Sequence, residues 1–161
     1  MRRSDFKDKR VVVVGDSILD CTIYTDALGL SLESPTLKVL KDRDEYSFGG
    51  AANVVQNLIS LGAGCTYITA LGMDEYSDYY SQWDASTPQL TLKGVFDDRK
   101  NTVKTRIWVA RGQDRYKYLQ INQQVSGSLS RASRDKLISE LEDQVPRADV
   151  LLLVDYGLGV L

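Results

Sequence analysis

The sequence contains no histidine among its 161 residues. This absence excludes a Ser-His-Asp or Cys-His catalytic group, a His-ligated zinc site and acid–base chemistry by imidazole. The sequence also has only two cysteines, Cys21 and Cys65. Two are too few for a structural zinc site, which needs about four ligands, and for a disulfide framework. We therefore expect two reduced thiols, as in a cytoplasmic protein.

Long apolar runs and a strong net charge are also absent. No apolar stretch approaches the roughly 20 residues that cross a membrane, and the run at 11–14 after the basic segment 1–10 is too short for a signal peptide. The net charge of −2 gives no general attraction to nucleic acid or to an anionic membrane. We expect a single domain over residues 1–161 with a solvated leader, binding no nucleic acid and no membrane.

The hydrophobic pattern predicts an α/β fold. Residues 11–14 are a continuous β-branched run, typical of a strand buried on both faces, and 149–154 is predicted to be another fully buried strand. Residues 65–70 are also predicted to form a strand. Residues 51–61 repeat apolar side chains at three- and four-residue spacing, as in an amphipathic helix. Strands that alternate with helices in this way favour a doubly wound, mostly parallel sheet. We also expect two helices, over 74–85 and 130–144, and two short strands, over 21–25 and 37–40.

The stretch 90–121 has a different pattern. Polar and apolar residues alternate in three segments separated by turn-like sequences at 97–101 and 112–114, which is typical of an antiparallel meander with one solvated face. We expect an added antiparallel β lid made by strands in 21–47 and 90–121. Because a buried parallel strand normally continues through a crossover, the end of the chain just after such a strand predicts a fold that is incomplete at its C-terminus.

Polar residues follow the predicted strands at their carboxyl ends, where open α/β sheets bind ligands. Asp16 and Asp20 leave the first strand four residues apart, and carboxylates suit sugar hydroxyls or a metal ion. Gly49 and Gly50 precede the helix at 51–61, where glycines allow close approach and the helix N-terminus favours polar oxygens. Asn53 lies in the first turn of that helix. The alternative is that these residues only cap turns, face solvent or pack.

A basic strand is the third candidate. Period-two alternation over residues 102–111 puts Lys104 and Arg106 on one face, together with Trp108. Arg binds phosphate through a planar fork and Lys as a point charge, so this pair predicts a phosphate site. A solvated lid face is an equally good interpretation. Nucleic-acid binding would use the same cations, but the acidic balance of the chain argues against it.

Two other interpretations fail on the residues. The Gly-Asp-Ser block ending at Ser17 resembles the nucleophile block of GDS-type esterases, which need a general base that a chain without histidine does not supply. A Rossmann dinucleotide site is also excluded, because no G-x-G-x-x-G follows the first strand.

Taken together, the motifs resemble those of the PfkB, ribokinase-like carbohydrate kinases, and in order and spacing the D-glycero-β-D-manno-heptose 7-phosphate kinases of the RfaE or HldE type. The resemblance covers nearly the whole chain and rests on segments 11–20, 31–39, 48–54, 61–64, 71–74, 102–106 and 154–159. It implies a ribokinase-like fold with a β lid and a sugar or sugar-phosphate substrate, with a heptose phosphate favoured. It also implies ATP and Mg²⁺ as cofactors of the complete enzyme and a homodimer formed through the lid.

The resemblance also implies roles for single residues. Asp20 and Asn53 would bind sugar hydroxyls, Gly49 and Gly50 would lie against the sugar, and Asp16 would be a weaker counterpart. The sequence departs from the family pattern at Phe48, which replaces proline, and at Leu158, which replaces a lysine that contacts phosphate or nucleotide.

The family's Gly-Ala-Gly-Asp block, which provides the base and the anion hole, is not found in these 161 residues. We therefore assign no catalytic residue and no metal ligand here, and expect the sugar-binding half of a kinase. The alternative is a non-catalytic module, or a kinase remnant, that dimerises through its lid.

Overall fold

The computed structural model describes residues 6–124 and 127–161, so Arg2 and Arg3 of the expected leader lie outside the described residues. One layer is a parallel sheet, sheet A, whose strands lie in the order β5-β4-β1-β8. Its strands are β1 (Arg10–Gly15), β4 (Gly64–Leu71), β5 (Leu90–Phe96) and β8 (Val150–Val154).

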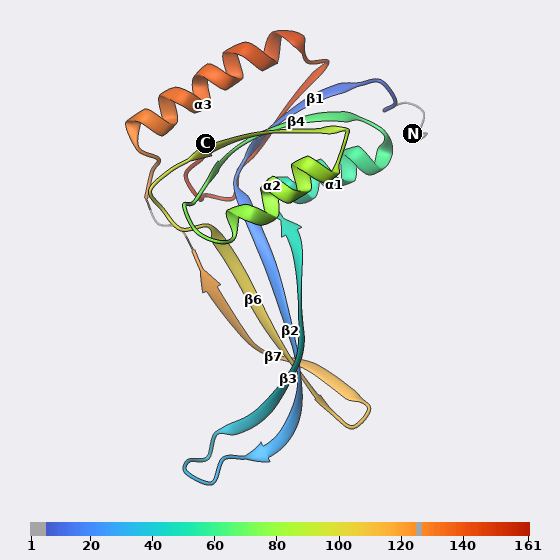
Figure 1. Ribbon diagram of the computed structural model, residues 1–161, viewed down its shortest axis with the longest axis vertical. Helices are drawn as coiled ribbons and strands as arrows, with labels where there is room; N and C mark the ends of the chain where they lie inside the picture. Colours follow the sequence, from blue (N-terminus) through green and yellow to red (C-terminus); the bar gives the residue numbers. More distant parts are fainter. Residues whose placement is uncertain (1–5, 125–126) are drawn as a thin grey trace.

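Helices cover both faces of sheet A (Figure 1). Helices α1 (Gly50–Leu61) and α2 (Ser77–Ser86) lie on one face, and α3 (Arg131–Gln144), followed by the short helix η2 (Val145–Arg147), lies on the other. The predicted α/β fold with a mostly parallel, doubly wound sheet is therefore confirmed. No helix in the described part of the chain is long and apolar enough to cross a membrane.

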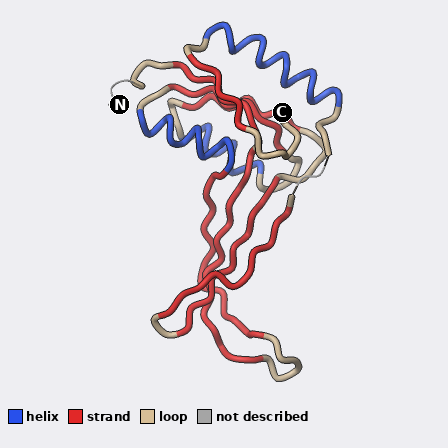
Figure 2. The backbone as a smooth tube through the Cα atoms, turned by 180° about the vertical axis from the view of Figure 1, so that it is seen from behind, coloured by secondary structure: helices blue, strands red, loops and turns tan. Residues whose placement is uncertain are grey.

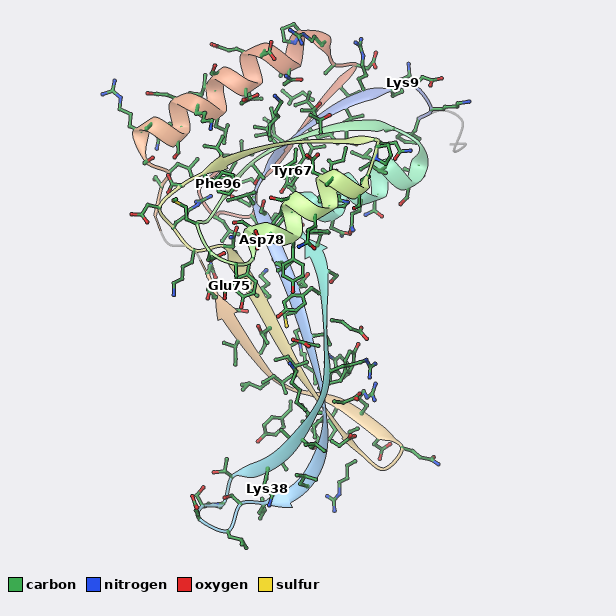
Figure 3. The ribbon with its side chains drawn as sticks, in the orientation of Figure 1. Lys9, Lys38, Tyr67, Glu75, Asp78 and Phe96 are labelled. Carbon is green, nitrogen blue, oxygen red and sulfur yellow. The ribbon has the colours of Figure 1, made fainter. Side chains whose placement is uncertain are left out.

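A second, mixed sheet, sheet B, extends away from this layer as two long hairpins (Figure 2). Its order is β3-β2-β6-β7, with β2 antiparallel to β3, β6 antiparallel to β7, and β2 parallel to β6. Its strands are β2 (Ser17–Leu30), β3 (Leu37–Gly49), β6 (Thr102–Arg111) and β7 (Asp114–Gln123). We call the hairpins β2–β3 and β6–β7 the two arms; Lys38, labelled in Figure 3, lies near the far end of the first.

The first strand of the predicted meander belongs to sheet A instead. β5 pairs in parallel with β4, so the expected lid segment 90–121 contributes only β6 and β7 to sheet B. The alternating pattern arises because β5 is an edge strand among the described residues, where polar side chains also find partners. Lys93 Nζ, for example, lies 3.3 Å from Glu140 Oε2 of α3.

The strands of the arms and β8 also differ from expectation. The segments predicted at 21–25 and 37–40 are parts of strands of 14 and 13 residues. Most of β3 is exposed on both faces, so its residues 41–48 show no apolar alternation from which a strand could be predicted. β8, predicted to be buried on both faces, is an edge strand of the described chain, and its Val150 and Leu153 are exposed. An apolar composition identifies a strand but not what covers it.

The core has two layers, one on each face of sheet A. Val11 and Val13 of β1 face α1 and α2, where they pack with buried Tyr67 and Tyr80. Val12 and Val14 face the opposite way, in a cluster that includes Leu137 of α3. A β-branched run buried on both faces explains why β1 reads as continuously apolar.

Buried Asn101 joins the loop before β6 to the loop between β4 and α2. Its Oδ1 accepts the N–H of Gly72 at 3.0 Å, and its side-chain amide donates to Ser77 Oγ at 2.9 Å and to a carboxylate oxygen of Asp74. A side chain on Gly72 would meet the backbone of residues 99–101, so the two loops are in direct contact.

Replacing Asn101 by Ala will destabilise the protein by about 2 kcal/mol or more, because it leaves buried donors and acceptors without partners. The measurement is the free energy of unfolding in urea. Asn122→Ala, at an exposed position of β7, is the matched control and should change stability by less than about 0.5 kcal/mol. Equal effects of the two variants would contradict a role for Asn101 in joining the loops.

Candidate functional site

The candidate site lies where the chain passes between the two sheets. β1 continues into β2 with only Asp16 between them, so β2 begins at the carboxyl end of a sheet A strand. β3 runs back antiparallel to β2, pairs Gly49 with Ile18, and enters α1 without a loop. The start of β2, the end of β3 and the N-terminus of α1 therefore meet at one point.

A cavity of about 480 Å³ opens at this junction. Its walls come from β2, β3, α1 and β6, with one residue from the segment after β8. The lining residues are Ile18, Asp20, Ser47, Phe48, Gly49, Gly50, Asn53, Gln56, Lys104, Arg106 and Tyr156.

Sheet B has one polar and one apolar face at its base. Side chains alternate along a strand, so Asp20, which pairs with Lys104 in the β2–β6 register, shares a face with Lys104 and Arg106. Leu19 and Val103, which directly precede Asp20 and Lys104 in their strands, belong to a buried cluster on the opposite face that packs against α2. Figure 3 shows the end of α2 nearest sheet B, marked by the labels of residues 75 and 78.

Asp20 is held from two sides. Arg106 Nη1 donates to Asp20 Oδ1 at 2.6 Å, and the two side chains are 31% and 23% exposed, respectively. A Cβ added to Gly49 would lie 2.6 Å from Asp20 Oδ2. Glycine at position 49 therefore makes room for the carboxylate.

Gly50 allows the sharp entry into α1. Its φ of +58° is in the left-handed region, and an added Cβ would lie 2.6 Å from the carbonyl oxygen of Asp16. The next amide, of Ala51, donates to that oxygen at 3.0 Å. The first turn of α1 has no acidic residue of its own and its N-cap makes no side-chain hydrogen bond, so the nearest acid to the positive end of this helix is Asp20, beside the N-cap Gly49. Exposed Asn53 lies in this turn.

Asp16 has a different environment from Asp20. Its carboxylate is 1% exposed and accepts the backbone N–H groups of Tyr156 at 2.8 Å, Leu158 at 3.2 Å and Val160 at 3.1 Å. It does not line the cavity. Instead it fixes the segment that follows β8 and so places Tyr156 at the cavity wall.

Ser17 belongs to a buried chain of hydroxyls. Its Oγ lies 2.9 Å from the hydroxyl of Tyr67 and 2.7 Å from Thr69 Oγ1, which donates to the carbonyl of Gly15 at 2.8 Å. Burial raises the pKa of Tyr67 to about 12, so its hydroxyl is neutral and donates. The serine is thus engaged in holding β1, β2 and β4 together.

The structure brings most of the predicted site residues into one cavity: Asp20, Gly49, Gly50, Asn53, Lys104 and Arg106. Sequence reasoning missed Ser47, Gln56 and Tyr156. Spacing could have revealed the first two, because Ser47 pairs with Asp20 across the hairpin and Gln56 lies one helical turn after Asn53. Leu158, noted as a replacement for lysine, is buried, and its carbonyl accepts from Arg99 at 3.1 Å.

The described residues contain no cluster of three or more Asp, Glu, His or Cys that could hold a metal ion. The chemistry of the cavity is therefore that of its carboxylate, amides and two cations. Carboxylate and amide oxygens accept hydrogen bonds from hydroxyls, and cations attract anionic groups.

Known proteins resemble this chain in sequence. The family model described as pfkB family carbohydrate kinase matches residues 8–115. Two curated relatives are each named bifunctional protein HldE: that of Rhodopseudomonas palustris strain BisA53 is 32% identical over 151 residues, and that of Geotalea uraniireducens strain Rf4 is 33% identical over 166 residues. The alignments cover 94% and 96% of this chain but only 31% of each relative, so the chain spans about a third of their length.

Solved structures share the fold. Phosphofructokinase-2 from Escherichia coli, in complex with fructose-6-phosphate, aligns with a TM-score of 0.62 at 16% identity, over 91% of this chain and 45% of that chain. A carbohydrate kinase from Agrobacterium tumefaciens aligns with a TM-score of 0.59 at 17% identity, over 90% of this chain and 45% of that chain. At this identity the similarity shows a ribokinase-like α/β fold, as expected, and no more.

Replacing Asp16 by Ala will destabilise the protein by about 3 kcal/mol or more, because three backbone donors, two of them on buried residues, lose a charged acceptor. Asp16→Asn will also destabilise it, since an amide cannot accept at both positions. Urea unfolding measures both variants. Asp20→Ala, which removes a half-exposed ion pair, is the control and should lower the free energy of unfolding by about 1 kcal/mol or less. The opposite ranking of Asp16→Ala and Asp20→Ala would contradict these assignments.

Proposed function

The chain belongs to the pfkB family of carbohydrate kinases, and from this premise we propose that its cavity binds the sugar substrate of a kinase that phosphorylates a sugar hydroxyl. Residues 1–161 form the sugar-binding part of the kinase domain, and sheet B is its lid. Asp20 and Asn53 bind sugar hydroxyls, and Gly49 and Gly50 shape the wall beside them.

The observation that carries this proposal is the convergence of Asp20, Asn53 and the glycine pair on one cavity. These residues come from β2, from the end of β3 and from the first turn of α1. A polyol offers several hydroxyls at fixed spacing, which a carboxylate and an amide bind by accepting and donating hydrogen bonds.

The charge of the cavity favours a phosphorylated sugar. Its ionisable lining residues are one acid, Asp20, and two cations, Lys104 and Arg106, which leaves one net positive charge. The positive end of the α1 dipole adds to it. A heptose phosphate, which the similarity to the HldE proteins favours, and other sugar phosphates would supply the matching negative charge.

The complete enzyme of such a family uses ATP and Mg²⁺. We assign no Mg²⁺ ligand to the described residues, since they show no acidic cluster, and we assign them no ATP site. We also assign them no catalytic base. The part proposed for this chain is to bind and orient the sugar, which in phosphoryl transfer accounts for much of the rate enhancement.

Replacing Asp20 by Ala in the full-length protein will abolish measurable binding of D-glycero-D-manno-heptose 7-phosphate while the fold stays intact. The lost interactions are hydrogen bonds to a charged group, each worth about 1.5–3 kcal/mol, so affinity falls at least tenfold. Calorimetry measures binding and circular dichroism the fold. Asp26→Ala, an exposed acid further along the same strand, is the control. Unchanged affinity of Asp20→Ala would remove this residue from the site.

A second candidate function is dimerisation through the arms, with or without catalysis. Leu119 and Ile121 of β7 are 47% and 52% exposed and share one face of the strand. Leu40, in the other arm, is 59% exposed. Apolar side chains that recur on neighbouring surface positions favour contact with another protein, here a second copy of the chain.

Double substitution of Leu119 and Ile121 by Glu will convert a dimer to a monomer, because burying two carboxylates in an interface is costly. Sedimentation velocity measures the association state. Gln120→Glu, on the opposite face of β7, is the control and should leave the dimer intact. A wild-type protein that stays monomeric at high concentration would exclude this function. A tight dimer that binds no sugar phosphate would favour the non-catalytic module.

A further inference from the structure

We propose that the two cations of the cavity have different tasks. Lys104 binds the anionic group of the substrate, whereas Arg106 is a positioning residue that holds the Asp20 carboxylate toward the sugar hydroxyls. This division of roles rests on the proposed function and names the residue that makes the site select a sugar phosphate over a free sugar.

The first argument is the choice of ion-pair partner. In the β2–β6 register Asp20 lies directly opposite Lys104, whereas Arg106 lies opposite Thr22, one step further along the same face. The ion pair nevertheless forms with Arg106, over 2.6 Å. Within residues 6–124 and 127–161, Lys104 makes no ion pair and no hydrogen bond of its side chain, and it lines the cavity. Its ammonium group is therefore available to a ligand.

The second argument is that the carboxylate is clamped. Arg106 holds Oδ1, and Oδ2 lies against the backbone of Gly49, where no side chain would fit. The ion pair on Oδ1 and the closeness of Oδ2 to Gly49 restrict rotation of the carboxylate, so a sugar would meet an acceptor that is already oriented. Preorganisation of this kind lowers the entropic cost of binding. The planar guanidinium loses less freedom per hydrogen bond than an ammonium would, which suits arginine to this task.

The third argument is local charge. The positive charge of Arg106 is offset by Asp20 at contact distance, so a phosphate placed on that guanidinium would compete with the Asp20 carboxylate for it. Lys104 supplies the remaining positive charge of the lining. A phosphate or other anion therefore gains most by contacting Lys104.

The test compares three probes in the full-length protein: D-glycero-D-manno-heptose 7-phosphate, the unphosphorylated heptose and inorganic phosphate. Calorimetry and saturation-transfer NMR give the affinities, and thermal melting reports the fold. Lys104→Ala should lower the affinity for the heptose phosphate and for inorganic phosphate about tenfold or more. Its affinity for the free heptose should change by less than about twofold. Lys117→Ala, an exposed lysine of β7, is the matched control and should change none of them.

Arg106→Ala should weaken binding of the uncharged free heptose at least as strongly as it weakens binding of inorganic phosphate, because Arg106 acts on the sugar through Asp20. Arg106→Lys should restore part of the affinity for both sugars equally, which a residue needed only for folding or only for phosphate would not do. This variant also keeps the test valid if Arg106→Ala unfolds.

Two results would overturn the division of roles: an unchanged affinity of Arg106→Ala for the free heptose, or equal losses of affinity for free and phosphorylated heptose in Lys104→Ala. Failure of the proposed function looks different. In that case the wild-type protein binds neither sugar, or Asp20→Ala binds both as tightly as the wild type does.

Discussion

The buried carboxylate of Asp16 is the interaction on which the rest of the structure depends. It accepts three amides from the segment after β8, while its carbonyl accepts the first free amide of α1 and its own N–H donates to the carbonyl of Val154. One residue therefore ties the exit of β1, the start of β2, the N-terminus of α1 and the end of β8 together. These are the elements whose junction leaves the cavity, and a shift of any of them would change its shape.

The presence of glycine at positions 49 and 50 is also explained by the structure itself. Gly49 leaves space for the Asp20 carboxylate, and Gly50 adopts a left-handed conformation beside the Asp16 carbonyl. Both roles concern the backbone and two acidic residues before any ligand is considered. Side chains alternate in direction along β2 and β6. The charged side chains therefore face the cavity, and Leu19 and Val103 face the aromatic residues of α2. Binding groups and core packing thus share the same strands without competing for the same face.

The sequence predicted the location of the site better than the roles of its members. Carboxyl ends of parallel strands meet at one edge of a sheet, so polar residues after predicted strands were expected to converge, and the lining of the cavity agrees. The residues alone did not distinguish Asp16 from Asp20, although the family resemblance made Asp16 the weaker candidate, because only the fold decides which carboxylate meets backbone amides. The pairing of β5 and the exposure of β8 were mispredicted for a related reason: alternation and apolarity describe a strand, whereas its neighbours depend on the whole topology.

The two acids show how stability and binding are separated within four residues of chain. A buried carboxylate with three amide donors contributes strongly to folding, since each donor would otherwise lose its partner. A half-exposed pair such as Asp20 and Arg106 contributes about 1 kcal/mol or less. Asp20 therefore adds little to the fold, yet its geometry is as restricted as that of a core residue. A restricted but weakly stabilising carboxylate, beside a cation with no partner of its own in the described chain, is the arrangement that the proposed sugar-binding function would use.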